Sequence, residues 1–406
     1  MPKVSKKGKS MPSSPIRRLA PYAEAAVKKG VHIYHLNIGQ PDIPTPKEFW
    51  DAVKQIDVDV LAYSPSGGYI ELREKYAEYF REQCHLKQIT SDDVLITTGA
   101  SEGLFFTILS LFDEGDELII QEPLYANYIG YSKSGNVKIK AITTNFEDGF
   151  KLPSIDEFER NITERTKAIL ICNPSNPTGY NYSKEELERL KDIALKHGLF
   201  IISDEVYRVF NYSDEEHISM LSFPEIEQHV VLVDSLSKKY SVCGARIGAV
   251  VSKNKEVLET VLKFAQQRLS PPTVEQLGAI SLFDVDQQYF LGVRDEYIER
   301  RDVLVNALNA VDGVRCHTPM GAFYCMVQLP VIDTEHFCQW ILEDFSYEGD
   351  TVMMAPGSGF YSTEGLGRDE VRMAYVLEKS LLKKAVKCLE EGLKEYKNKY
   401  PKLCKK

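Results

Sequence analysis

One segment near the middle of the chain restricts the possible fold more than any other. Two short apolar runs, 168–172 (AILIC) and 199–203 (LFIIS), have the length and residue types of buried strands. Between them, Ser183 and Glu186 have the spacing of a helix capping box, and Gly198 stands where that helix would end. The segment therefore predicts a strand–helix–strand crossover, which joins parallel strands and is nearly always right-handed.

The same alternation of strands and helices continues on both sides of this segment, over about residues 90–250. Further strand candidates are 93–98, 116–121, 137–142 and 230–233. We therefore predict an α/β fold with a large domain built on a mostly parallel, doubly wound sheet. Ligands bind such sheets at the edge formed by the carboxyl ends of the strands. The loop 173–179 and Asp204 are expected at that edge.

The pattern changes after about residue 290. A long charged helix is expected over 293–311, with strands at 321–328 and 371–376 and a final amphipathic helix. These elements predict a smaller α+β domain. The domain assignment is 1–44 for an N-terminal tail and part of the small domain, 45–290 for the large domain and 291–406 for the small domain.

Composition excludes several classes of function. The net charge of -10 disfavours nucleic acids and anionic membranes as partners, because no basic excess offsets phosphate repulsion. The 8 cysteines are scattered without a Cys-x-x-Cys pair, so we expect no metal centre and a reducing, cytoplasmic setting. No apolar run is long enough to span a bilayer.

Two polar motifs follow the strands of the crossover. The first is the loop Asn173-Pro-Ser-Asn-Pro-Thr-Gly179, whose prolines and glycine stiffen the chain and leave the Asn176 amide free to donate. An isolated Asn-Pro would indicate only an ordinary turn. The second is Asp204-Glu-Val-Tyr207, where Asp204 ends an apolar strand and needs a cation or several donors. Asp204 could satisfy a protonated ring nitrogen, with Tyr207 nearby, although a helix N-cap is an equally good interpretation of Asp204 taken alone.

A third motif, residues 234–248 (DSLSKKYSVCGARIG), follows the predicted strand at 230–233. Its two lysines are candidate amine nucleophiles of the kind that attack aldehydes. Ser235, Ser237 and Arg246 suit a phosphate monoester, with the guanidinium as a bidentate donor. A Lys-Lys pair by itself is usually solvated surface, but this one directly follows a buried strand.

The fourth motif is weaker and consists of a glycine turn at 97–102 (TTGASE) that opens a helix. The backbone amides of Ala100 and Ser101 would be free at the helix start and could complete a phosphate site. Glycine turns before helices are common, so this motif supports the others without standing alone.

Together these motifs resemble those of the class I/II aminotransferases, the fold type I family of pyridoxal-phosphate enzymes. The loop at 173–179, the Asp-Glu-x-Tyr at 204–207 and the Ser-x-Ser-Lys…Gly-x-Arg-x-Gly at 235–248 stand in the family's order. The stretches 36–42 (LNIGQPD) and 355–360 (APGSGF) match as well. The resemblance covers about residues 15–395.

The resemblance implies roles that spacing does not give. It selects Lys238 over Lys239 as the lysine that forms a Schiff base with pyridoxal 5'-phosphate, Tyr125 as the residue stacked on the ring, and Asn176 as a contact of cofactor and substrate. It assigns the substrate α-carboxylate to Arg372, although the residue alone would be taken for a surface arginine, and places Gly39 beside the substrate. It also implies a homodimer in which Tyr63 reaches the partner subunit's cofactor phosphate.

The implied reaction is a ping-pong exchange of an α-amino group between an L-amino acid and a 2-oxo acid. The side-chain preference stays open: some relatives acting on aspartate have a lysine at the position of Ser101, and Arg268 is only a weak candidate for a second carboxylate site. A carbon–sulfur β-lyase of the same fold is the main alternative. A cofactor-binding regulator is less favoured, because about 40 residues before the first motif are too few for a DNA-binding domain.

Overall fold

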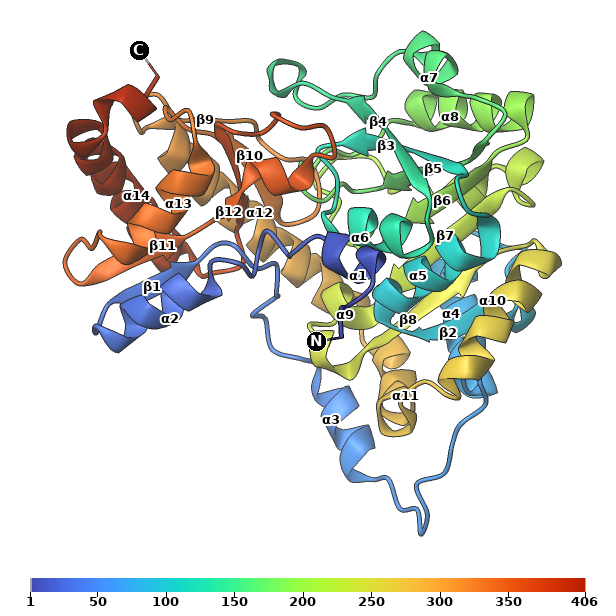
Figure 1. Ribbon diagram of the computed structural model, residues 1–406. Helices are drawn as coiled ribbons and strands as arrows, with labels where there is room; N and C mark the ends of the chain where they lie inside the picture. Colours follow the sequence, from blue (N-terminus) through green and yellow to red (C-terminus); the bar gives the residue numbers. More distant parts are fainter. Residues whose placement is uncertain (1, 406) are drawn as a thin grey trace.

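The computed structural model describes residues 2–405, which form two lobes built on separate sheets (Figure 1). The larger lobe contains a seven-stranded sheet with the strand order β2-β8-β7-β6-β5-β3-β4. Its strands are β2 (Val94–Thr98), β3 (Glu117–Glu122), β4 (Lys138–Thr143), β5 (Thr166–Cys172), β6 (Phe200–Asp204), β7 (Val230–Ser235) and β8 (Ile247–Val251). Only β8 runs against the others, so the predicted mostly parallel sheet is confirmed.

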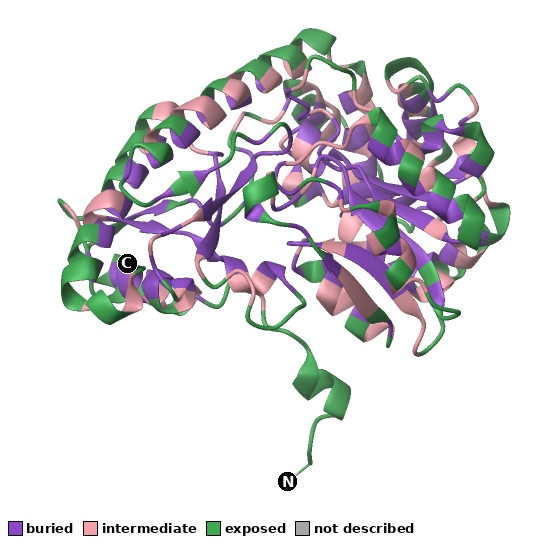
Figure 2. Ribbon diagram, turned by 90° about the horizontal axis from the view of Figure 1, so that it is seen from above, coloured by how far each residue is buried: buried purple, intermediate pink, exposed green. Residues whose placement is uncertain are grey.

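Helices cover both faces of this sheet, and alternate residues of one strand enter different cores. Leu118 and Ile120 of β3 join one buried cluster, while Ile119 joins the other. The helices of this lobe are α3 (Lys47–Lys54), α4 (Ile70–Gln83), α5 (Gly99–Leu111), α6 (Asn127–Ser134), α7 (Ile155–Asn161), α8 (Lys184–His197), α9 (Leu236–Lys239), α10 (Lys255–Arg268) and α11 (Thr273–Ile280). The sheet is the most completely buried layer of the molecule, and the outer helix faces are exposed (Figure 2).

The crossover predicted from the sequence is present with its expected signals. The Ser183 hydroxyl accepts a hydrogen bond from the Glu186 amide, and the Glu186 carboxylate accepts one from the Ser183 amide. Gly198 ends α8 with a left-handed φ of 64°. The helix therefore begins and ends where local chemistry satisfies its free backbone groups.

The smaller lobe combines an antiparallel four-stranded sheet, ordered β12-β13-β10-β9, with a parallel pair of strands, β1 and β11. Its strands are β1 (His32–His35), β9 (Arg315–Cys316), β10 (Tyr324–Gln328), β11 (Asp350–Met353), β12 (Ala355–Pro356) and β13 (Glu370–Ala374). Its helices are α2 (Ala20–Lys28), α12 (Gln287–Asn309), α13 (Thr334–Glu343) and α14 (Lys379–Lys399). Because β1 pairs with β11, the N-terminal strand lies in this lobe, whereas Lys7 donates to the Ser134 carbonyl of α6 in the large lobe.

Two details differ from the sequence expectations. The helix expected from residue 293 begins at Gln287, because the Asp286 side chain accepts from the Gln288 amide and caps it six residues earlier. The domain boundary placed after residue 290 falls inside this helix, α12, and stays a prediction.

A short helix, α1 (Lys6–Ser10), precedes α2 and buries none of its residues. Within residues 2–405, no helix is both long and apolar enough to cross a membrane.

Candidate active site

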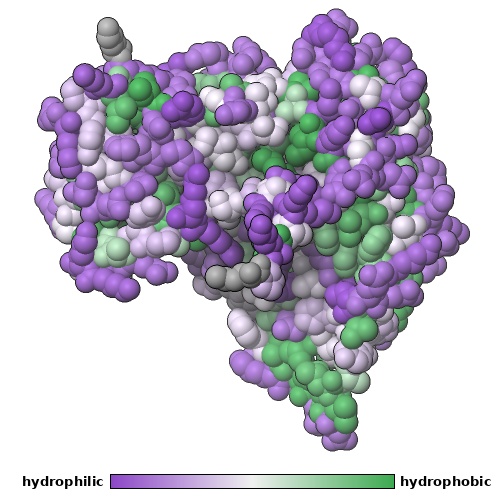
Figure 3. Space-filling view, viewed as in Figure 1, coloured by the Kyte–Doolittle hydropathy of each residue, from purple (hydrophilic) through white to green (hydrophobic). Residues whose placement is uncertain are grey.

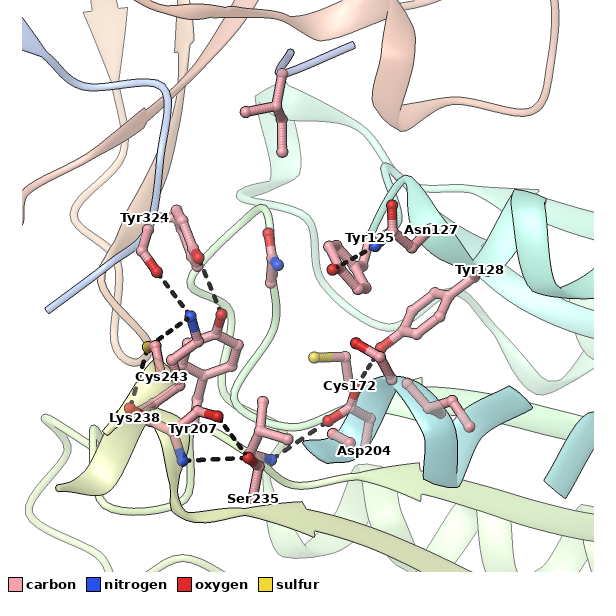
Figure 4. A pocket seen from close by; sticks show the side chains of 18 of the residues that line it. Tyr125, Asn127, Tyr128, Cys172, Asp204, Tyr207, Ser235, Lys238, Cys243 and Tyr324 are labelled. Atoms are coloured by element: carbon pink, nitrogen blue, oxygen red, sulfur yellow. Dashed lines mark hydrogen bonds between the residues drawn. The ribbon is translucent and has the colours of Figure 1, made fainter. Parts of the chain in front are cut away.

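A cavity of about 630 Å³ lies between the carboxyl edge of the seven-stranded sheet and the small lobe (Figure 4). Loops after β5, β6 and β7 form its floor, and residues of β10 and β13 close the opposite side. All the predicted site residues except Tyr63 line this cavity: Gly39, Ala100, Ser101, Tyr125, Asn176, Asp204, Tyr207, Ser235, Ser237, Lys238, Arg246 and Arg372. The fold thus brings together motifs that are far apart in the sequence.

One end of the cavity is built to hold an anion. Ser235 and Ser237 place their hydroxyl oxygens 2.9 Å apart, and the Arg246 guanidinium is held by the Cys243 carbonyl at 2.9 Å. The first turn of α5 points amides without intrahelical acceptors toward this end. Gly99 has φ +72°, and a Cβ there would overlap the Arg246 guanidinium, so only glycine lets the helix start approach the arginine. Hydroxyls, guanidinium and helix start together match a phosphate group.

At the centre, Asp204 is a buried carboxylate with 3% exposure. It accepts hydrogen bonds from the Tyr128 hydroxyl at 2.7 Å and from the Val206 amide at 3.3 Å. Within residues 2–405 it forms no ion pair, and burial raises its pKa to about 6. The helix N-cap interpretation of Asp204 is wrong, because no helix begins there. The carboxylate instead offers a charge partner to a cationic group in the cavity.

The two adjacent lysines have opposite surroundings. The Lys238 amine donates to the Gly39 carbonyl at 2.7 Å and lies 3.8 Å from the Cys243 sulfur, inside the cavity. Lys239 is buried on the other side of α9, where its amine is 2.8 Å from the Asp234 carboxylate and 4.1 Å from the ring centroid of Tyr79. Burial lowers the pKa of Lys239. Only Lys238 is therefore available to a molecule in the cavity.

Arg372, on β13, is held on several sides and is 1% exposed, so the surface interpretation of this residue is wrong. It donates to the Asn176 side-chain oxygen at 3.0 Å and to the Asn37 carbonyl at 2.7 Å. The rings of Tyr324 and Phe360 lie 4.3 and 4.8 Å from its Cζ. Its buried Nε has no partner within residues 2–405. A charged, fixed and incompletely bonded guanidinium is a site for a carboxylate.

Sequence reasoning missed several side chains of the cavity. Tyr324 of β10 places its hydroxyl 2.9 Å from that of Tyr207, and a Cβ at Gly39 would overlap Tyr324. Tyr128, in the first turn of α6 and three residues after Tyr125, is the donor to Asp204. Tyr324 has no motif around it, whereas the spacing of the two tyrosines at 125 and 128 was a usable signal.

Arg17 is another residue that the sequence did not single out. It lies in the turn before α2 and lines the cavity together with Ser14 and Ile16. Its side chain has no hydrogen-bond or ion-pair partner within residues 2–405. The neighbouring Arg18 pairs instead with Glu335 of α13. Arg17 is thus a third arginine of the cavity, after Arg246 and Arg372, and remains free for a ligand.

Tyr63 lies away from the cavity. It is 79% exposed, on the segment between α3 and α4 that projects from the large lobe (Figure 1). Val58, Val60 and Leu61 are exposed on the same segment, and apolar side chains gather at this projection (Figure 3). The chain thus presents Tyr63 outward on an apolar arm.

Comparison with known proteins decides the family. Residues 31–389 match the sequence profile described as "Aminotransferase class I and II". The chain belongs to the class I and II aminotransferase family. The aspartate aminotransferase of Thermotoga maritima is 33% identical over 96% of this chain and 99% of its own length. Its Pyrococcus horikoshii counterpart is 31% identical over 89% of this chain and 90% of its own length.

Solved structures of aminotransferases share the fold. A Thermotoga maritima aspartate aminotransferase structure superposes with a TM-score of 0.87 at 32% identity, covering 96% of this chain and all of that one. An alanine aminotransferase from Pyrococcus furiosus gives 0.86 at 31% identity over 97% of this chain and all of that one. The protein is an aminotransferase of fold type I, and the predicted fold class and reaction class are confirmed. Nothing in these likenesses favours the β-lyase alternative.

The buried carboxylate of Asp204 should make the cofactor-free aminotransferase less stable as the pH rises. Its pKa is about 6 in the folded protein against an ordinary value of 3.8, so the folded state binds this proton more tightly than the unfolded state. Stability is then lost between about pH 4 and pH 6. Asp204→Asn stays neutral and should exceed the wild type by up to about 3 kcal/mol above that window, and by less within it.

Urea unfolding of cofactor-free protein at about pH 5 and pH 7.5 measures this difference. Asp92→Asn, at a carboxylate that is 91% exposed, serves as the control and should change little at either pH. An Asp204→Asn gain that is equal at both pH values would contradict the assigned titration.

Proposed function

We propose that this aminotransferase uses pyridoxal 5'-phosphate, held by the cavity residues described above. The donor set fits the group: an anion site at Ser235, Ser237 and Arg246, a buried carboxylate at Asp204 that forms no ion pair within residues 2–405, and an accessible amine at Lys238. Tyr125 supplies an aromatic face on the same wall. When bound, this cofactor supplies an aldehyde that reacts with amines and a ring that withdraws electrons from the substrate. The observation that carries the proposal is the convergence of these groups in one cavity.

Each residue then has a task that its surroundings support. Asp204 holds a proton on the ring nitrogen, because a buried carboxylate is stabilised by a neighbouring cation. Arg372 and Asn176 bind the substrate α-carboxylate through the free Nε and the Asn176 amide. The Lys238 amine, positioned by the Gly39 carbonyl, removes the proton from the substrate Cα. Tyr207 and Tyr324 share a hydrogen bond and close the wall beside Gly39.

Single-turnover spectroscopy tests this proposal. The purified protein should show a visible absorption band that bleaches when an amino acid is added alone and returns on addition of a 2-oxo acid. Lys238→Ala should abolish the band and reduce turnover by at least about 10²–10⁴-fold, because it removes the covalent contact and the general base. Lys184→Ala, at an exposed lysine of α8, should behave as wild type.

Two outcomes would contradict the proposal. A cofactor-saturated protein without a visible band would exclude a pyridoxal enzyme. A band that persists while pyruvate accumulates from cystathionine would indicate the β-lyase instead.

We further propose that two copies form a homodimer through the arm that contains Tyr63. The exposed apolar side chains of Val58, Val60 and Leu61 support this proposal, because apolar side chains gathered on an exposed surface are typical of a protein–protein interface. Tyr63 would then act at the partner's phosphate site.

A reducing, cytoplasmic setting is supported by the cysteines, all of which lie free of disulfides.

Mixing two inactive variants tests the shared site. Lys238→Ala and Tyr63→Ala dimers should each have low activity. After the subunits are mixed and re-associated, hybrid dimers contain one intact site, so about one quarter of wild-type activity should return. Failure to recover activity, with hybrid dimers verified by mass, would exclude the shared site; Lys238→Ala mixed with itself is the control.

The free arginine of the cavity supports a dicarboxylic acid as one of the two substrates. The proposed phosphate and α-carboxylate sites use Arg246 and Arg372, whereas Arg17 has no acidic partner within residues 2–405. Relatives of this chain are aspartate aminotransferases. We therefore propose that Arg17 binds the distal carboxylate, although Ser101 stands where some of these enzymes have a lysine.

Arg17→Met should lower kcat/KM for glutamate and 2-oxoglutarate by about 10–100-fold, the loss of one charge-assisted hydrogen bond. Activity on alanine should stay near the wild-type value. Arg18→Met is a matched control at the adjacent arginine, whose partner is Glu335. Equal losses on glutamate and alanine would show that Arg17 does not select the distal carboxylate.

A further inference from the structure

Glu122, the last residue of β3, is a fully buried carboxylate outside the cavity, with 0% exposure. One of its oxygens accepts from the Thr143 hydroxyl at 2.9 Å. The other accepts three hydrogen bonds, from the Ser362 amide at 2.7 Å, the Ser362 hydroxyl at 3.0 Å and the Thr363 amide at 3.1 Å. Within residues 2–405 no cation pairs with it, so these donors alone compensate its burial.

The donors come from both lobes. Thr143 ends β4, the neighbour of β3 in the seven-stranded sheet. Ser362 and Thr363 belong to the small lobe, in the segment that connects β12 to β13. The Leu124 amide adds a backbone bond of 2.7 Å to the Phe360 carbonyl of the same segment. Glu122 therefore links the end of β3 in the large lobe to the loop at Ser362 and Thr363 in the small lobe through hydrogen bonds.

Both sides of this contact lead directly into the cavity. On the large-lobe side, Tyr125 is three residues after Glu122. On the small-lobe side, Phe360 packs 4.8 Å from the Arg372 guanidinium, and Ala355 of β12 pairs with Arg372 in the sheet. The distance between the wall at Tyr125 and the guanidinium of Arg372 thus depends on how closely the loop is held to β3.

We propose that Glu122 is a positioning residue that sets the placement of Arg372 and thereby the affinity for the substrate α-carboxylate. The proposal rests on the role of Arg372 given above. A carboxylate suits this task because it only accepts hydrogen bonds, and three donors converge on one of its oxygens. A glutamine keeps one acceptor oxygen but loses the negative charge that strengthens the hydrogen bonds from Ser362 and Thr363, so it would loosen the loop without emptying the space.

Glu122→Gln should raise KM for the amino acid about 10-fold while kcat changes less than about 3-fold, since a charged hydrogen-bond acceptor is lost but the reacting groups stay. The affinity for pyridoxal 5'-phosphate and the visible absorption of the cofactor-loaded enzyme should stay at the wild-type level. Glu117→Gln is a matched control, because Glu117 begins the same strand and its side chain accepts, within residues 2–405, only from the Thr163 hydroxyl. It should leave KM unchanged.

A double-mutant cycle separates positioning from general destabilisation. Arg372→Leu should raise KM strongly, and adding Glu122→Gln to it should raise KM no further, because the residue acts through the arginine. If Glu122→Gln multiplies KM by the same factor in both backgrounds, or lowers cofactor affinity as much as substrate affinity, the proposal is overturned.

Ser362→Ala, which removes one donor, keeps the proposal testable if Glu122→Gln does not fold. It should give a smaller rise in KM with the same dependence on Arg372, and an unchanged KM would contradict the proposal. The proposed function fails separately: if Arg372→Leu alone leaves KM unaltered, the carboxylate assignment is wrong before Glu122 is considered.

Discussion

The parallel pairing of β5, β6 and β7 is the constraint on which the site depends. In register, Cys172 pairs with Asp204 and Asp204 with Val233, so the three strands end at nearly the same level. The next residues of each strand therefore project from a single edge, which delivers the Asn176 loop, the Asp204 carboxylate and the Lys238 helix to one floor. A slip of one residue in any pairing would turn that side chain to the opposite face of the sheet.

Buried basic side chains beside this floor neutralise two of its carboxylates, those of Glu205 and Asp234. Burial alone would raise the pKa of Glu205, yet the neighbouring Arg208 and His217 hold it at about 2. Lys239 likewise pairs with Asp234 at 2.8 Å. Of the three buried carboxylates at this floor, Glu205 and Asp234 thus have cationic partners. Asp204 pairs with no cation within residues 2–405, so it remains available to a cation from outside the chain.

Local chemistry explains what the sequence could predict. The bounds of α8 follow from Ser183 and Gly198, because a capping hydroxyl and a left-handed glycine satisfy the ends of a helix without help from the rest of the fold. The polar motifs could be placed as well, because each directly follows a predicted strand and parallel strands end at one edge of the sheet. The start of α12 was missed because Asp286 caps it outside the charged pattern that suggested the helix.

Residues that reach the cavity from the small lobe could not be found in this way. Tyr324 and Arg17 acquire their positions only when β10 and the N-terminal turn pack against the large lobe, and neither lies in a local motif. Arg372 shows the same limit, because its burial comes from Tyr324, Phe360 and Asn176 rather than from its own strand. The resemblance to a family identified Arg372, and no periodicity did.

The aminotransferase therefore assembles its site from two parts with different origins. The seven-stranded sheet supplies the groups that we propose hold the cofactor, together with the Lys238 amine, and the small lobe supplies the Arg372 guanidinium that we propose binds the substrate carboxylate. Polar contacts join the two parts around the cavity: Arg372 donates to Asn176 across 196 positions of sequence, the hydroxyls of Tyr207 and Tyr324 share a hydrogen bond, and Glu122 accepts from Ser362 and Thr363 across 240 and 241 positions. Substrate affinity should accordingly be more sensitive than cofactor affinity to anything that shifts one lobe against the other, because only the substrate bridges both.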